Sequence, residues 1–138
     1  MVRWRFFDYV GTDGRNRSAE WYAAQGPEVR AAFDVTLQIL RATEDWVQPP
    51  VVHFKNLHKA HKGLSEIRFY IDEPRPGKHP TRRRFRGIGI HRPSHGDFVL
   101  LVGYEERGMN YIPADALEEA MRAKSRFEQG LGWIHERS

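Results

Sequence analysis

Alternation of apolar and polar residues predicts four β-strands in this chain of 138 residues. In the first strand Val2, Trp4 and Phe6 share one face, which is typical of a half-buried strand. The last strand is nearly all apolar, which predicts a central position with both faces covered. The predicted strands are residues 2–10, 64–71, 83–91 and 97–104.

Helical spacing predicts three helices. Val29, Phe33, Leu37 and Leu40 recur on one face of a helix over residues 27–43. A short helix over 19–24 precedes it, with Ser18 as its predicted N-cap. The last helix ends at Gly130, and its first turn has a predicted capping box formed by Asp115 and Glu118.

The order is therefore strand, two helices, three strands, helix. Short turns between successive strands indicate antiparallel pairing. We expect an α+β fold: a four-stranded antiparallel sheet with a helix pair and a C-terminal helix on one face, and a polar opposite face. Residues 72–81 hold three prolines and one glycine, which predicts a loop. No linker divides the chain, so residues 1–138 are expected to form a single domain.

Composition narrows the setting of the protein. The chain has no cysteine, which excludes disulfides and thiolate metal sites and suits a reducing compartment. Its N-terminal residues carry charge too early for a secretory signal, and no apolar stretch reaches membrane-spanning length. We expect a cytoplasmic protein without membrane partners.

Positive charge is concentrated in one part of the chain. The formal net charge is +4, and residues 53–95 hold many lysines, arginines and histidines but few acids. Such a field attracts phosphate backbones, and the planar guanidinium suits phosphate. A solvated charged surface is the alternative interpretation. The peak of the cluster consists of Arg75, Lys78, Arg82, Arg83, Arg84 and Arg86.

Several motifs, in this order, resemble the RelE/ParE toxin superfamily, and most closely its HigB-like, phage-derived branch. They are the strand over residues 64–69, the aromatic–Arg segment Phe85–Gly89, the strand Val99–Tyr104, and Ile112–Pro113 before an acidic, Ala-rich helix. The resemblance implies the toxin of a type II toxin–antitoxin system, acting as a ribosome-dependent mRNA endonuclease. In that family the ribose 2′-hydroxyl attacks the adjacent phosphate, and no metal or other cofactor is expected.

The resemblance also assigns residues to roles. As catalytic residues it implies Arg86 and Arg68 on the phosphate, Tyr111 stacking on a base or donating a proton, Arg107 as a further cation, and His91 as an acid or base. A protein antitoxin is the implied partner, and the sheet edge at Val2–Val10 or Arg83–His91 is one place for it. The residues expected to bind RNA are Lys59, Lys62, Arg82, Arg83 and Arg84.

Two alternatives stay open. The family usually places basic residues where this chain has Glu105 and Glu106, and carboxylates there repel phosphate. This favours a ParE-like protein that binds gyrase, or a phage-derived module that binds RNA and cleaves nothing. Glu105 and Glu106 are then antitoxin contacts or salt-bridge partners of the arginines. The oligomeric state does not follow from the sequence.

Overall fold

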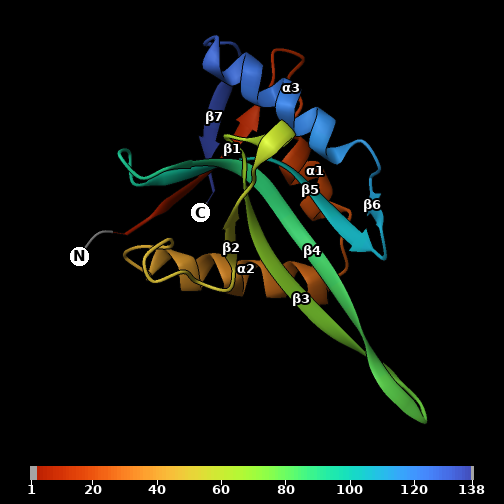
Figure 1. Ribbon diagram of the computed structural model, residues 1–138. Coiled ribbons are helices and arrows are strands. Elements are labelled where there is room, and N and C mark those ends of the chain that lie inside the picture. Colours follow the sequence, from red (N-terminus) through yellow and green to blue (C-terminus); the bar gives the residue numbers. More distant parts are fainter. Residues whose placement is uncertain (1–2, 138) are drawn as a thin grey trace.

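The computed structural model describes residues 3–137, so the predicted strand start at Val2 lies outside the described residues. Within that range a seven-stranded sheet lies between two helical layers (Figure 1). The elements in chain order are β1 (Arg5–Val10), α1 (Arg17–Ala23), α2 (Pro27–Arg41), β2 (Phe54–Asn56), the 3₁₀ turn η1 (Lys59–His61), β3 (Ser65–Arg75), β4 (Lys78–Arg92), β5 (Asp97–Arg107), β6 (Asn110–Ile112), α3 (Ala116–Glu128) and β7 (Trp133–Glu136).

The sheet is mixed, so the predicted four-stranded antiparallel sheet is wrong. Its strand order is β2-β3-β4-β5-β1-β7, with β6 paired to β5. β1 runs parallel to β5, with Phe6 opposite Phe98, whereas the other pairs are antiparallel. Short turns predict pairing only between strands that follow each other in the chain. Two helices lie between β1 and the later strands, so turn length could not predict the partner of β1. The added strands β2, β6 and β7 have three or four residues, too few to show alternation.

The helices cover both faces of the sheet, whereas one covered face was expected. Phe33 and Leu37 of α2 share an apolar cluster with Phe6 of β1. Ala116 and Ala120 of α3 share a second cluster with Phe7, the neighbour of Phe6. Neighbouring strand residues point to opposite faces, so α2 and α3 lie on opposite sides, as Figure 1 shows. The expectation that strand 97–104 is covered on both faces is confirmed.

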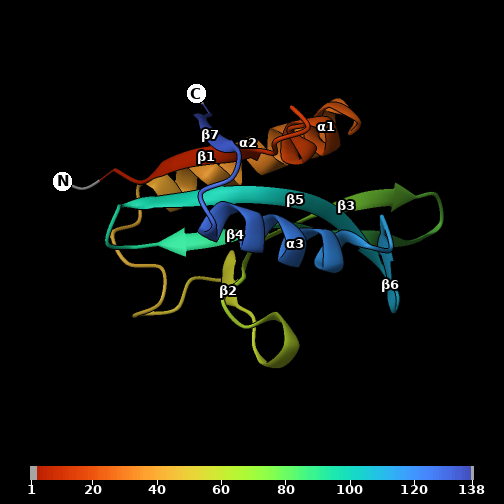
Figure 2. The same cartoon turned by 90° about the horizontal axis from the view of Figure 1, so that it is seen from above.

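The predicted loop over residues 72–81 is instead the far end of a long hairpin. β3 continues to Arg75 and β4 begins at Lys78, so only Pro76 and Gly77 turn the chain. Gly77 has a φ of 68°, a conformation that glycine adopts readily. The register shifts between Glu73 and Arg75, so the strands pair around a proline. In Figure 2 this end extends past the helices.

Two predicted helix caps are wrong. Asn16, not Ser18, caps α1 by accepting a hydrogen bond from the Ala19 N–H. The Ser18 hydroxyl instead donates to the buried Asp8 carboxylate at 3.0 Å. Asp115 occupies the N-cap position of α3, but its side chain makes no capping hydrogen bond. Sequence spacing identifies where these helices begin, but competing polar partners decide what each side chain bonds to.

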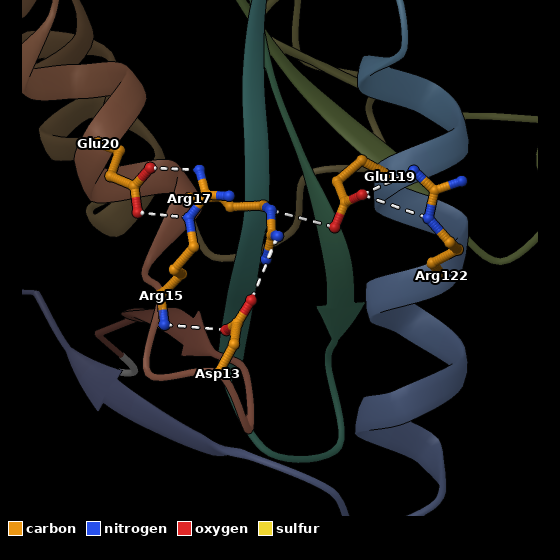
Figure 3. A network of polar contacts seen from close by, with 6 residues as sticks. All are labelled: Asp13, Arg15, Arg17, Glu20, Glu119 and Arg122. Atoms are coloured by element: carbon orange, nitrogen blue, oxygen red, sulfur yellow. Dashed lines mark hydrogen bonds and ion pairs between the residues drawn. The ribbon is translucent and has the colours of Figure 1, made fainter.

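An ion-pair network joins the start of α1 to α3 (Figure 3). Arg17 lies 3.3 Å from Asp13 and, through Nε, 3.1 Å from Glu119 on α3. Glu119 also pairs with Arg122 at 2.7 Å. The side chain of Trp21 packs directly on Gly103, where a Cβ atom would overlap the indole. These contacts fix the first turns of α1 and α3 against β5.

The two sheet edges expected to receive a partner are internal. β1 lies between β5 and β7, and β4 lies between β3 and β5, so neither strand is free to pair with another chain. Among the described strands, β2 and β7 end the main strand order, and β6 is a further edge strand beside β5. β2 pairs only with Ser65–Ile67, so β3 has no strand partner on that side beyond Arg68. None of the described helices is long and apolar enough to cross a membrane.

Candidate functional site

The candidate site lies on the face of β3, β4 and β5 that is shared with α3. In register, Arg68 lies opposite Arg86, and Arg86 lies opposite Tyr104. α3 begins beside Tyr104, with Ala116 in the same apolar cluster. Beyond that point the strands continue without a helix on this side (Figure 1). We call this surface the open face; its residues are Glu66, Arg68, Tyr70, Arg82, Arg84, Arg86, Tyr104 and Glu106.

The inner part of the open face is a charged cluster. The Glu66 carboxylate lies 3.6 Å from Nε of Arg86 and 3.7 Å from Nε of Arg68. Glu106 lies 3.2 Å from the Arg86 guanidinium. Glu66 and Arg86 are 7% and 8% exposed, so both charges are largely withdrawn from water. Two arginines directly opposite each other repel, and the carboxylates between them offset that repulsion.

A tyrosine completes this cluster. The Tyr104 hydroxyl donates to Glu66 at 3.4 Å, and its ring lies 4.6 Å from that of Tyr111 on β6. Burial raises the pKa of Glu66, although Arg86 and Arg68 oppose the shift. Burial and the nearby Glu66 charge also raise the pKa of Tyr104. A carboxyl group of raised pKa beside cations and a hydroxyl is an arrangement suited to proton transfer.

The outer part of the open face is formed by arginines and one tyrosine. The Arg82 guanidinium lies 3.8 Å from the centre of the Tyr70 ring and is held by Asp72. Arg84 lies opposite Tyr70 in register and is exposed. A hollow of about 140 Å³ opens here. Its lining residues are Val52, His53, Arg68, Phe69, Tyr70, Arg82, Arg84 and Arg86.

Three of the five predicted catalytic residues lie together. Arg68 and Arg86 share the open face, and Tyr111 reaches it through Tyr104. Arg86, Ile88 and Ile90 share one face, as alternation predicts, and it is the α3 side. Among the predicted RNA-binding residues, Arg82 and Arg84 also lie on the open face.

Arg83 and Arg107 lie on the opposite face of the sheet, away from the open face. Glu105 is opposite Phe85, which belongs to the α2 cluster. Arg83 pairs with Glu105 at 2.9 Å and Arg107 does so at 3.1 Å. Adjacent strand residues point to opposite faces, so Arg83 cannot join Arg82 and Arg84. Glu105 and Glu106 are confirmed as salt-bridge partners of arginines, one on each face.

His91 lies on the other side of the sheet from the cluster, and Lys59 and Lys62 lie in the turn before β3. His91 stacks on Trp46, 5.0 Å away, on the α2 side of the sheet. Burial lowers its pKa, with Asp45 opposing. Lys59 and Lys62 lie at η1, whose following residue Gly63 packs against Lys124 of α3. Within residues 3–137 neither lysine forms an ion pair with Glu66 or Glu106.

Glu66 and Tyr104 are the residues that the sequence did not single out. They lie within the strand motifs of residues 64–69 and Val99–Tyr104, and alternation places Glu66 and Arg68 on one face. The pairing of Glu66 with Arg86 depends on the register between β3 and β4, which sequence spacing does not reveal.

Comparison with known proteins adds no further constraint. The sequence matches no protein-family model, no curated protein and no solved structure. The resemblance to the RelE/ParE superfamily therefore stays a prediction, and function is inferred from the site.

Proposed function

We propose that this protein binds RNA through the open face. The observation that carries the proposal is the convergence of Arg68, Arg82 and Arg84 with Tyr70 around one hollow. Arg68 and Arg82 each have a carboxylate neighbour, whereas Arg84 has none within 4.0 Å among residues 3–137. Exposed guanidinium groups next to an aromatic ring match the phosphate and base surfaces of RNA.

Arg84→Ala tests this proposal, and Arg107→Ala is its matched control. Both arginines are exposed and lie on neighbouring strands, but on opposite faces of the sheet. We expect Arg84→Ala to weaken binding to a labelled RNA several-fold in a fluorescence anisotropy titration, and Arg107→Ala to leave binding unchanged. Equal effects of the two substitutions would show non-specific attraction, and the open face would then not be the binding surface.

Cleavage of the bound RNA is the second candidate, as the resemblance to toxins implies. The inner cluster favours it, because Glu66 is positioned to take the proton of a ribose 2′-hydroxyl. The 2′-oxygen then bonds to phosphorus, the bond to the 5′-oxygen breaks, and that oxygen takes a proton from Tyr111. Arg68 and Arg86 stabilise the phosphorane charge. Binding is placed first because Glu66 and Arg86 are more than nine-tenths covered and already paired.

Glu66→Gln separates cleavage from binding. Loss of a general base typically lowers a rate by about 10²–10⁴-fold, while binding through Arg84 should persist. Cleavage should continue in the presence of a metal chelator, because the proposed mechanism uses only protein side chains. Cleavage at the wild-type rate in Glu66→Gln would remove Glu66 from the mechanism.

The cellular role follows from the same family resemblance. We propose a cytoplasmic toxin of a type II toxin–antitoxin system that acts on ribosome-bound mRNA, with an antitoxin as partner. Induced expression should then arrest growth with mRNA decay. A DNA damage response without mRNA decay would instead indicate the gyrase-binding alternative. If growth and translation continue unaffected, the protein is not a toxin, and only the RNA-binding proposal stands.

A further inference from the structure

The hollow on the open face has one preorganised aromatic wall. Tyr70 is 50% exposed, although it is a large aromatic side chain within a strand. Asp72 accepts hydrogen bonds from Arg82 at 3.0 and 3.3 Å. These bonds hold the guanidinium over the Tyr70 ring, 3.8 Å from its centre. The side chains are therefore ordered before any ligand arrives, which lowers the entropic cost of stacking on them.

The opposite wall comes from the segment before β2. The His53 ring is fixed by a 3.0 Å hydrogen bond between Nδ1 and the Arg68 carbonyl oxygen. Val52, 78% exposed, adds apolar surface at the rim. Arg68 and Arg84 supply positive charge within the same lining. A nucleotide, which has a planar base and a phosphate group, thus meets apolar, aromatic and cationic groups together.

The volume of the hollow suits one small ring. It measures about 140 Å³, while an apolar cavity of roughly 150 Å³ takes up a single benzene molecule. A pyrimidine is a six-membered ring of similar size. Duplex RNA keeps its bases stacked and paired inside the helix, so only an unpaired base reaches such a hollow.

Building on the RNA-binding function above, we infer that this hollow holds one unpaired base against Tyr70 and Arg82. Arg84 and Arg68 bind the flanking phosphates. The open face therefore selects single-stranded RNA over duplex RNA, and Tyr70 determines that selection. Base–aromatic stacking carries this preference, whereas the phosphate contacts are common to both forms.

The test compares a labelled oligouridylate with an RNA duplex of the same length, by anisotropy at fixed salt. Wild-type protein should bind the single strand at least about fivefold more tightly than the duplex. Tyr70→Leu should abolish this preference by weakening single-strand binding alone. Tyr70→Phe should retain it, because the ring remains. Tyr70 is exposed, so both variants are expected to fold, and circular dichroism verifies this.

An abasic oligonucleotide of the same length isolates the base. Its binding should be weaker than that of oligouridylate in the wild type, and equal to it in Tyr70→Leu. A preference for single strands that survives in Tyr70→Leu, or abasic binding as tight as that of RNA, overturns the base-binding hollow. Equal binding of duplex and single strand by the wild type also overturns it while RNA binding stands. Failure to bind either RNA overturns the RNA-binding function itself.

Discussion

At the scale of single residues, burial decides which charges are available. Arg82, Arg83 and Arg84 are adjacent in sequence, yet Arg83 is bound to Glu105 on one face while Arg84 is exposed on the other. His91 and Glu66 are two titratable groups whose pKa values are shifted mainly by burial. The pKa shift of each group leads to a separate prediction of how folding stability depends on pH.

His91→Phe is expected to make the protein less sensitive to acid. Burial among Trp4, Trp46 and Phe54 lowers the pKa of His91 below its usual 6.5, and Asp45 only partly offsets this. The unfolded chain therefore binds a proton that the folded chain resists, and stability falls as pH drops through about 6.5. Melting temperatures at neutral and mildly acidic pH measure the effect. The exposed His95 is the control, since His95→Gln should keep wild-type acid sensitivity.

Glu66→Gln is expected to gain stability relative to wild type as pH rises from about 4 to 7. The folded-state pKa of Glu66 is raised above 4.5, so its stabilising effect is present at low pH and is lost as pH rises through that pKa. Glu105→Gln should behave oppositely. Burial acts to raise the pKa of Glu105, but hydrogen bonds from Arg83 and Arg107 outweigh it and lower the pKa.

Urea denaturation across that pH range gives both differences in the free energy of unfolding. Parallel curves for wild type and Glu66→Gln would contradict a raised pKa at Glu66. The Glu105→Gln curve is the control, because it shows whether urea denaturation detects the effect of a lowered pKa.

At the scale of elements, the β3–β4 hairpin has two parts with different roles. Its inner part carries Ile67, Phe69 and Phe85 into the α2 cluster. Residues 72–82 are all exposed, and this end of the hairpin extends past the helices in Figure 2. The outer part is thus free to serve binding without a cost to the core.

Shortening the hairpin is expected to separate these roles. Joining Ile71 to Arg83, which are opposite in register, through an Asn-Gly turn removes Asp72 and Arg82. Thermal unfolding should stay close to wild type because no core residue is lost. Binding of oligouridylate should weaken, because the guanidinium over Tyr70 is gone. A large loss of stability would mean that the outer hairpin contributes to the core.

At the scale of the whole molecule, the modest net charge of +4 hides an uneven distribution. Most buried or half-buried arginines are matched by acids, as with Asp8 and Arg137 or Asp97 and Arg92. The remaining positive surface includes the outer part of the open face. RNA affinity should therefore reflect few phosphate contacts, not the total of 22 lysines and arginines.

The salt dependence of binding tests this count. Two phosphate contacts, from Arg68 and Arg84, predict a slope of about −1.4 for log K against log salt with single-stranded RNA. Arg84→Ala should reduce the slope by roughly 0.7, and Arg107→Ala should not change it. A slope several times steeper would show that a larger basic surface binds the RNA.

By itself the sequence determined the long elements and the faces of their residues. Periodicity placed β1, α2, β5 and α3, because burying one face imposes a repeat on consecutive residues. It also put Glu66 with Arg68, and Arg86 with Ile88. These residues are close in sequence, so they share a face of their strand whatever the topology of the sheet.

Only the tertiary structure decided which strands pair, and which residues of those strands lie opposite each other. The parallel pairing of β1 with β5, the division of the helices between two faces, and the register that sets Glu66 beside Arg86 all join residues distant in sequence. The same is true of the separation of Arg107 and His91 from the open face. Such contacts depend on which surfaces pack best across the whole chain, and no repeat in the sequence encodes them.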